Sequence, residues 1–164
     1  MDHGTATAPI SVADAIDDAV AIGTSASTSD FYVKGKICSI KYEYSAEYGT
    51  ATYNISEDGS EGIEFTVYSS YYFDNKKWQE GDNQIAVGDE VVVCGKIVNY
   101  NGNTPEFVSK QNYLVSLNGN TATGIQNVRV TEMNGLVYNL TGQRVGKPTQ
   151  KGIYLINGKK VLVK

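Results

Sequence analysis

The sequence has little histidine, cysteine or proline, and it contains no long apolar run. Its one histidine, His3, lies in a small polar segment at the start, so we expect it to be solvated rather than catalytic. Two cysteines without a partner histidine cannot complete a zinc site. No apolar stretch approaches the roughly 20 residues of a membrane helix. These absences predict a chain with no metal, no cofactor and no transmembrane segment.

A catalytic constellation is also missing. Glu57, Asp58 and Glu61 lie close together, but a tight turn explains their grouping. There is no glycine-rich phosphate loop, and the acidic residues at 74, 80 and 82 do not follow the spacing of a calcium loop. We therefore expect a protein that is not an enzyme.

Positive charge is scarce as well. The chain has 14 Lys and Arg against 18 Asp and Glu, a formal net charge of −4. An acidic chain repels phosphate at long range, so nucleic-acid binding would need a local basic patch. Hydrophobic residues make up 41 % and charged residues 20 %, which predicts a packed core. Twelve tyrosines and seventeen glycines against three prolines favour strands joined by tight turns.

The strongest strand signal covers residues 87–102. Its centre, V-C-G-K-I at 93–97, nearly repeats V-K-G-K-I at 33–37, which predicts two long paired strands of one small barrel. We expect Val91, Val93 and Ile97 to point inward. With Gly35 opposite Gly95, the two cysteines would lie too far apart for a disulfide, so both are predicted to be free.

The remaining elements follow in order along the chain. Residues 1–10 are predicted to be a flexible arm, and 11–22 a helix capped by Ser11, with Asp14 completing the cap. The apolar stripe of this helix is expected to cover an open end of the barrel, or else to bind a partner; it consists of Ala13, Ile16, Ala19 and Val20. Further strands are expected over 31–42, 49–56, 62–68 and 104–117, the last interrupted near 110–112. Residues 69–86 form a long insertion, the kind of segment that is often functional.

Two of these strands alternate cleanly between apolar and polar residues. The side chains expected to point inward are Ala51, Tyr53, Ile55, Ile63, Phe65 and Val67. Those expected to point outward are Thr50, Thr52, Asn54, Ser56, Glu64, Thr66 and Tyr68. Residues 11–118 thus form one domain, 119–124 a polar linker, and 125–164 a small unit of short strands, with hairpin turns at 141–142 and 157–158.

Five strands with a long insertion between the third and fourth match a Greek-key barrel of the OB-fold type. Residues 8–118 resemble an OB-fold domain of secreted and lipid-anchored proteins in Bacteroidetes-type bacteria, a family described as nucleic-acid-binding. The matching segments are S-V-A-D-A at 11–15, Y-V-K-G at 32–35, A-T-Y-N-I-S at 51–56, G-D-E-V-V-V at 88–93, G-K at 95–96 and T-P-E-F at 104–107.

The tail carries a second resemblance. V-Y-N-L-T-G-Q-R-V at 137–145 and K-G-I-Y-L-I-N-G-K-K at 151–160 resemble a shortened sorting domain read by the type IX secretion system of those bacteria. The start of the chain does not resemble a secretory signal. The resemblance therefore implies an exported protein whose signal segment is absent from this sequence.

The first functional hypothesis is binding of single-stranded nucleic acid, which combines cations along the backbone with rings that stack on bases. The residues expected to contact the ligand are Tyr32, Lys34, Lys36, Lys96 and Tyr100, extended by Tyr68 and Trp78. The alternative for each is an ordinary solvated barrel wall.

The second hypothesis is a protein- or glycan-binding module, because exposed rings suit both ligands and need no positive charge. The rings that could form such a surface are Tyr42, Tyr44, Tyr48, Tyr71, Tyr72 and Trp78. The alternative is that about half of them pack inward.

Overall fold

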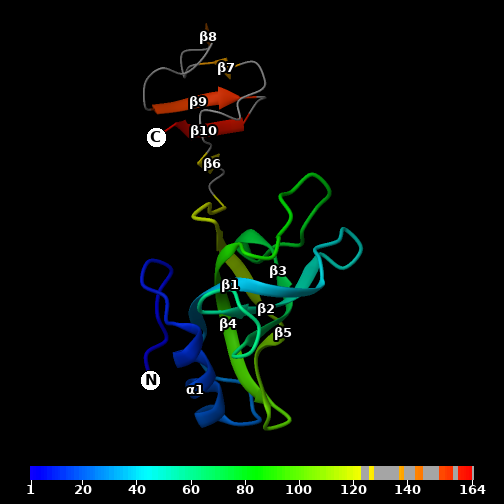
Figure 1. Ribbon diagram of the computed structural model, residues 1–164. Coiled ribbons are helices and arrows are strands. Elements are labelled where there is room, and N and C mark those ends of the chain that lie inside the picture. Colours follow the sequence, from blue (N-terminus) through cyan, green and yellow to red (C-terminus); the bar gives the residue numbers. More distant parts are fainter. Residues whose placement is uncertain (123–125, 128–136, 139–142, 146–151, 157–158, 164) are drawn as a thin grey trace. The chain divides into compact units, whose positions relative to one another are not determined.

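The structure, a computed structural model, describes every residue except 123–125, 128–136, 139–142, 146–151, 157–158 and 164 (Figure 1). The chain divides into two compact units, Met1–Asn118 and Gly119–Lys164. None of the helices in the described ranges is long and apolar enough to span a membrane.

The first unit is a closed barrel of five strands, arranged around its circumference in the order β1-β2-β3-β5-β4 (Figure 1). The strands are β1 (Phe31–Tyr42), β2 (Thr50–Ser56), β3 (Phe65–Tyr71), β4 (Glu90–Tyr100) and β5 (Thr104–Leu117). Neighbours are antiparallel except β3 and β5, which run parallel. The predicted mainly β barrel with an N-terminal helix is confirmed.

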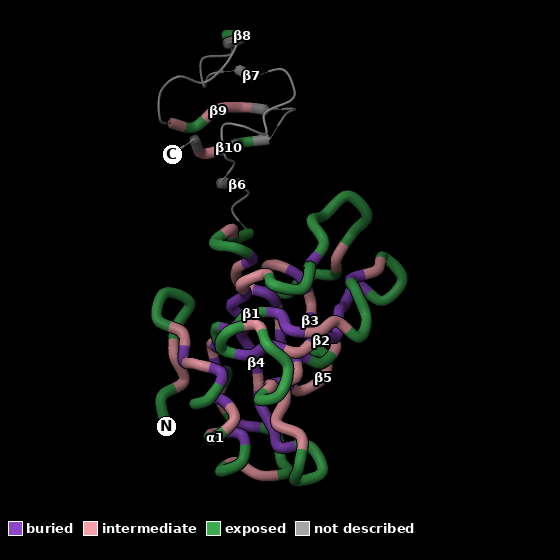
Figure 2. The backbone as a smooth tube through the Cα atoms, in the orientation of Figure 1, coloured by how far each residue is buried: buried purple, intermediate pink, exposed green. Residues whose placement is uncertain are grey.

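The barrel interior is filled by one side of every strand. Phe65 and Phe107 meet edge to face with ring centroids 5.2 Å apart, and the inward positions Val91, Val93 and Ile97 of β4 are fully buried as predicted. Buried segments follow the strands, whereas exposed residues follow the turns (Figure 2). This alternation, with a period of two, holds the barrel together by apolar burial.

Helix α1 (Val12–Ile22) begins at Ser11, whose hydroxyl oxygen accepts a hydrogen bond from the Asp14 backbone N–H at 3.0 Å. It packs on β1, β4 and β5. Its buried residues are Val12, Ala15 and Ala19, with Ile16 partly buried. The predicted stripe is therefore shifted: Ala13 is exposed and Val20 is 55 % exposed. The reason is that Val12, at the first helical position, already packs on β1.

Gly35 provides the room for this contact. A Cβ on Gly35 would lie 2.8 Å from Val12 Cγ2 and 3.1 Å from Ile55 Cβ. Gly95 instead faces the backbone of Gln111 and Asn112 in β5. The two glycines are not opposite each other, since Gly35 pairs with Val91 and Gly95 with Phe31. The predicted register was wrong by four residues, because the two similar glycines make room for different neighbours. Both cysteines are nevertheless free, as predicted, and both are buried.

We expect Gly35→Ala to lower the free energy of unfolding by about 1–3 kcal/mol, since the added methyl group overpacks the contact between α1 and β1. Val12→Ala in the same chain should recover part of that loss by removing the clashing Cγ2. Urea unfolding of the four chains in this double-mutant cycle would measure the coupling. If the losses of the two single variants simply add in the double variant, Gly35 and Val12 are not in the proposed steric contact.

The N-terminal arm, which was predicted to be flexible, forms hydrogen bonds with β1. The Tyr32 N–H donates to the His3 carbonyl at 2.8 Å, and the Lys34 N–H donates to the Ile10 carbonyl at 3.0 Å. The His3 ring packs on Phe31 with centroids 4.5 Å apart, so it is not freely solvated. The arm therefore lies along the edge of β1, where Ile10 forms an isolated bridge to Val33.

The β2–β3 hairpin also differs from the prediction. β3 begins at Phe65, so Ile63 lies in the preceding turn and is 77 % exposed rather than inward. The outward residues Thr50, Thr52 and Ser56 are buried, because neighbouring strands and loops cover them. The long insertion begins only after Tyr71 and contains a short turn, η1 (Phe73–Asn75).

The second unit is a small sheet with the strand order β6-β10-β9-β7-β8. Its strands are β6 (Gln126–Asn127), β7 (Val137–Tyr138), β8 (Arg144–Val145), β9 (Gly152–Ile156) and β10 (Lys159–Val163). β9 and β10 pair antiparallel. The two predicted hairpin turns, at 141–142 and 157–158, lie outside the described residues.

Candidate functional site

Four of the predicted ligand residues share the outer face of β1 and β4. Tyr32 pairs with Cys94, Lys34 with Val92, and Lys36 with Glu90. Lys96 lies on the same face, two residues beyond Cys94 in β4. The structure thus brings these four side chains onto one strip of the barrel wall.

Carboxylates accompany the lysines of this strip. Lys34 Nζ lies 3.1 Å from Glu90 Oε1. Lys96 Nζ lies 3.7 Å from Asp30 Oδ1 and donates to the Thr28 carbonyl at 2.8 Å. Such exposed pairs add little stability, about 0–1 kcal/mol. Each pair does, however, place a negative charge beside the lysine, so neither lysine adds a net positive charge to the strip.

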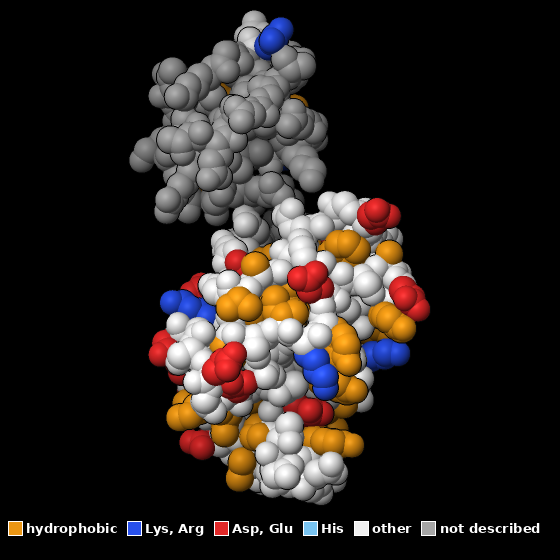
Figure 3. All heavy atoms as spheres, turned by 45° about the vertical axis from the view of Figure 1, so that its right-hand side comes forward, with side chains coloured by type: hydrophobic (Ala, Val, Ile, Leu, Met, Phe, Trp, Pro, Cys, Tyr) orange, Lys and Arg blue, Asp and Glu red, His pale blue; other side chains and the backbone are white. Residues whose placement is uncertain are grey.

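Lys36 has no ion pair among the described residues, but anionic groups surround it as well. It lines a small groove of about 220 Å³ with Glu57 and Glu90. The pKa of Asp58 in the adjacent turn is lowered, mainly by the Ser60 hydroxyl and to a lesser extent by Lys36. On the side of the barrel in Figure 3, acidic and basic side chains are interspersed. The strip is therefore not a basic patch.

A ring that was not predicted joins Tyr32 on this face. Tyr113 of β5 pairs with Cys94 of β4, so Tyr32 and Tyr113 flank the cysteine on neighbouring strands. Contact with the Cys94 thiol raises the pKa of Tyr32, and burial raises the pKa of both Cys94 and Tyr113. Only the register of β4 and β5 reveals this cluster, since the sequence marks residues 110–112 as an interruption.

The other three predicted residues lie elsewhere. Tyr100 is the last residue of β4, Tyr68 is on β3, and Trp78 lies in the β3–β4 connection, where its Nε1–H donates to the Asn83 carbonyl at 3.2 Å. The structure does not bring the seven residues together as one site.

A second face, the outer surface of β1, β2 and β3, carries two exposed rings. Tyr42 pairs with Thr52, and opposite residues of an antiparallel pair point to the same side. On the other edge of β2, a bulge places Tyr68 and Ser69 opposite Thr52; Ser69 has φ 45° and donates to Thr52 Oγ1 at 3.0 Å. Tyr42 and Tyr68, 63 % and 41 % exposed, therefore flank Thr52 across three strands.

The next row on this face is polar. Asn54 Nδ2 donates to Ser39 Oγ at 3.2 Å and to Glu64 Oε2 at 2.7 Å. Thr66 Oγ1 donates to Asn54 Oδ1 at 2.9 Å. We call Tyr42, Tyr68, Ser39, Asn54, Thr66 and Glu64 the tyrosine face. Its polar side chains are locked in one arrangement before any ligand arrives.

The β1–β2 loop and the β3–β4 connection form a rim held together by hydrogen bonds. Gln84, in the β3–β4 connection, accepts from the Tyr44 N–H at 3.1 Å and donates to the Tyr44 carbonyl at 2.9 Å. The Trp78 N–H donates to the Gly49 carbonyl at 3.0 Å. Hydrogen bonds thus join the β1–β2 loop to the long connection at two points.

The rings of this rim divide between core and surface. Tyr44 and Tyr72 are buried and meet edge to face at 5.2 Å, and burial raises the pKa of Tyr72 to about 12. Tyr48 is exposed, and Tyr71 and Trp78 are half-buried. Of the six rings in the second hypothesis, only Tyr42 and Tyr48 are fully at the surface.

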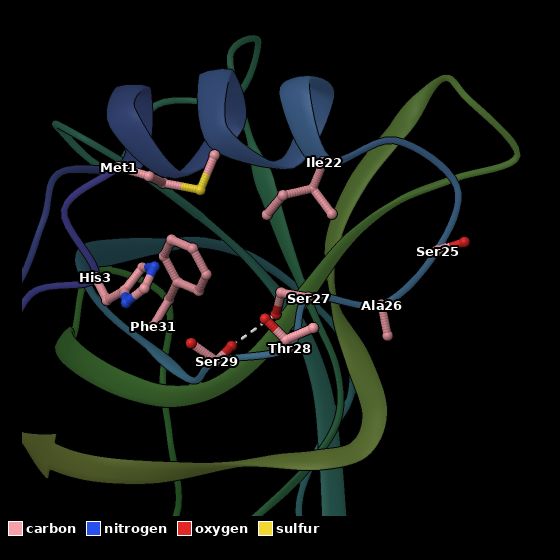
Figure 4. A pocket seen from close by; sticks show the side chains of 9 residues that line it. All are labelled: Met1, His3, Ile22, Ser25, Ala26, Ser27, Thr28, Ser29 and Phe31. Atoms are coloured by element: carbon pink, nitrogen blue, oxygen red, sulfur yellow. Dashed lines mark hydrogen bonds between the residues drawn. The ribbon is translucent and has the colours of Figure 1, made fainter.

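A cavity of about 360 Å³ lies beside the N-terminal arm (Figure 4). Its lining residues are Met1, His3, Ile22, Ser25, Ala26, Ser27, Thr28, Ser29 and Phe31. Ser27 has a structural role here, because its hydroxyl donates to the Ser29 carbonyl at 2.7 Å and accepts from the Ile97 N–H at 3.0 Å. Its described lining contains no lysine or arginine.

Comparison with known proteins adds no assignment. No protein family matches the chain, and no curated protein is significantly similar to it. Within the described part of the chain, no three histidine, cysteine, aspartate or glutamate residues are grouped so as to hold a metal ion.

Proposed function

We propose that the barrel is a non-catalytic carbohydrate-binding module whose ligand lies on the tyrosine face. The observation that carries this proposal is the row in which Tyr42 and Tyr68 flank Thr52 on three adjacent strands. Their strands are separated by two strand spacings, roughly 10 Å. Two exposed rings at this separation suit an extended chain of sugar rings.

The chemistry of the face supports a sugar over a polyanion. The C–H face of a sugar ring packs on a tyrosine ring, and its hydroxyls need neutral or acidic hydrogen-bonding groups nearby. Ser39, Asn54 and Thr66 supply such groups directly beside the rings. Lys34 and Lys96, in contrast, lie on the β1–β4 face, each beside a carboxylate.

The fold class supports a ligand site on the same surface. The strand order agrees with the proposal that this is an OB-fold. This barrel type binds oligosaccharides and oligonucleotides through the outer face of β2 and β3 and through the β1–β2 and β4–β5 loops. Export from the cell, which the tail resemblance implies, would place the module among extracellular glycans. Export is part of this proposal.

Single-stranded nucleic acid is the second candidate, and a specific observation favours it. Tyr32 and Tyr113 flank Cys94 on the strip that also carries Lys34 and Lys96. Base stacking on such rings contributes roughly 1–3 kcal/mol per base. Matched cations weaken this candidate, because phosphate would have to displace Glu90 and Asp30 from the lysines.

A glycan array followed by calorimetric titration tests the proposal. We expect Tyr42→Ala and Tyr68→Ala each to weaken binding of a selected oligosaccharide by about thirtyfold, the effect of losing a contact worth about 2 kcal/mol. Tyr100→Ala, which removes an exposed ring at the end of β4, is the matched control and should leave binding unchanged.

An oligonucleotide serves as the comparison ligand. Absence of glycan binding, or an equal loss in the Tyr100→Ala chain, would overturn the proposal. Oligonucleotide binding that falls steeply with salt and is lost in Tyr32→Ala would favour the second candidate instead.

A further inference from the structure

The hydrogen bonds inside the tyrosine face determine which ligand groups it can still accept. The Glu64 carboxylate can only accept, so the atom of Asn54 that faces it at 2.7 Å must be the amide nitrogen. Asn54 Oδ1 then faces Thr66, whose hydroxyl must donate. One carboxylate thus fixes the direction of every hydrogen bond in the row.

Few donors remain after these bonds are formed. Both hydrogens of Asn54 Nδ2 are used, on Ser39 and Glu64. The hydrogen of Thr66 is used on Asn54. Within the polar row only the Ser39 hydroxyl keeps a hydrogen to offer, while the tyrosine hydroxyls lie at the other end.

Acceptors, in contrast, remain open. A carboxylate has about four lone-pair sites, and Glu64 uses one for Asn54 and one for the Gly62 N–H at 3.0 Å. Thr66 Oγ1 and Asn54 Oδ1 also keep free lone pairs. The row therefore favours ligand groups that donate, namely hydroxyls and ammonium groups.

Acidic side chains predominate at the Glu64 end of the tyrosine face. Glu64 is the charged member of the row, and Glu61 lies in the adjacent turn. Two cations of β1 flank the face. Lys41 Nζ lies 5.7 Å from the centroid of the Tyr42 ring, at the opposite end. Lys36 pairs with Ser56, in the row next to Asn54, but it lies beside Gly59 and helps to lower the pKa of Asp58 in the β2–β3 turn. A ligand carboxylate or sulfate placed against this row would meet the like charge of Glu64 and, within the row, no open donor apart from Ser39.

We infer that the tyrosine face selects neutral or amino-bearing glycans and rejects acidic ones, with Glu64 as the residue that determines this specificity. The inference rests on the proposed function and deepens it. A neutral chain would place its hydroxyls, and an amino-sugar chain its ammonium groups, against Glu64 and Thr66.

Three soluble oligosaccharides of similar length test this inference: a cello-oligosaccharide, a glucosamine oligomer and an oligogalacturonate. Calorimetric titration of the full chain at low salt should show the acidic oligomer binding at least tenfold more weakly than the stronger of the other two. Glu64→Gln keeps an acceptor for Asn54 but removes the charge, and should reduce that difference about tenfold. Glu61→Gln removes a nearby charge outside the row and should reduce that difference much less.

The outcomes separate the two proposals. Binding of the acidic oligomer as tightly as the others, or an equal effect of Glu61→Gln, would overturn the selectivity while leaving carbohydrate binding intact. Binding of none of the three, together with a silent glycan array, would overturn both. Thermal unfolding of each variant confirms that the face is still folded.

Discussion

Replacing Gly95 with alanine is expected to destabilise the barrel by about 3 kcal/mol or more, near the upper end of the cost of overpacking. A Cβ at this position would collide with the carbonyl of Gln111 and with the backbone of Asn112. These are backbone atoms, which cannot swing aside as the end of a flexible side chain can. For a unit of this size the loss corresponds to a fall in Tm of roughly 10–20 °C.

The collision arises from the bulge in β5. Gly95 pairs with Asn112, but Ile97 pairs with Phe107, so the chain between them leaves the ladder, with Lys110 at φ 58°. The Asn112 side chain then donates to the carbonyls of Val108 at 2.9 Å and Tyr68 at 3.0 Å. Since Tyr68 belongs to the tyrosine face, Gly95 supports the proposed site through the bulge.

Fluorescence of Trp78, the only tryptophan, would follow unfolding of the barrel unit alone. A Gly95→Ala chain that unfolds at the same urea concentration as the original would contradict the close approach of β4 and β5.

Raising the pH above 10 is expected to destabilise the barrel steeply. Burial raises the pKa of Tyr44 and of Tyr53, so both keep their protons in the folded state. In the unfolded chain tyrosine ionises near its usual pKa of about 10. Stability is therefore complete below that pH and is lost as the pH rises above it, by about 1.4 kcal/mol per pH unit for each buried tyrosine.

Urea titrations across this pH range would show a slope of roughly 3 kcal/mol per pH unit for the two residues together. Tyr53→Phe provides the control. The Tyr53 hydroxyl is buried without a hydrogen-bond partner, so its removal should cost little at neutral pH and should lower the slope by about 1.4 kcal/mol per pH unit. A slope unchanged by this substitution would show that Tyr53 ionises equally in both states.

Much of the barrel follows from local patterns in the sequence. Alternation correctly places Val33, Tyr53 and Phe65 inward, because one buried face per strand leaves a pattern with a period of two. Register between distant strands leaves no such pattern. The similar segments around Gly35 and Gly95 suggested that these glycines pair with each other. Instead, each glycine makes room for a different part of the chain: Gly35 for Val12, and Gly95 for the bulge in β5.

The candidate site was less predictable than the fold. Tyr68 was predicted to be an outward ring, yet its neighbour Tyr42 belongs to a strand 26 positions earlier, and only the bulge at Ser69 aligns both with Thr52. Tyr113 was missed for the same reason, because only the register of β4 and β5 places it near Tyr32. The lysines were correctly placed at the surface, but their ion pairs with Asp30 and Glu90 depend on tertiary geometry that composition does not encode.

The paired N-terminal arm affects how this chain behaves among its own copies. In the first half of β1, β4 occupies one edge, and pairing with β2 begins only at Lys36. The other edge would display free N–H and carbonyl groups if His3 and Ile10 did not occupy them. An uncovered strand edge is a template for intermolecular pairing and aggregation. The arm thus covers an edge of β1 that would otherwise be open to pairing with a second copy of the chain.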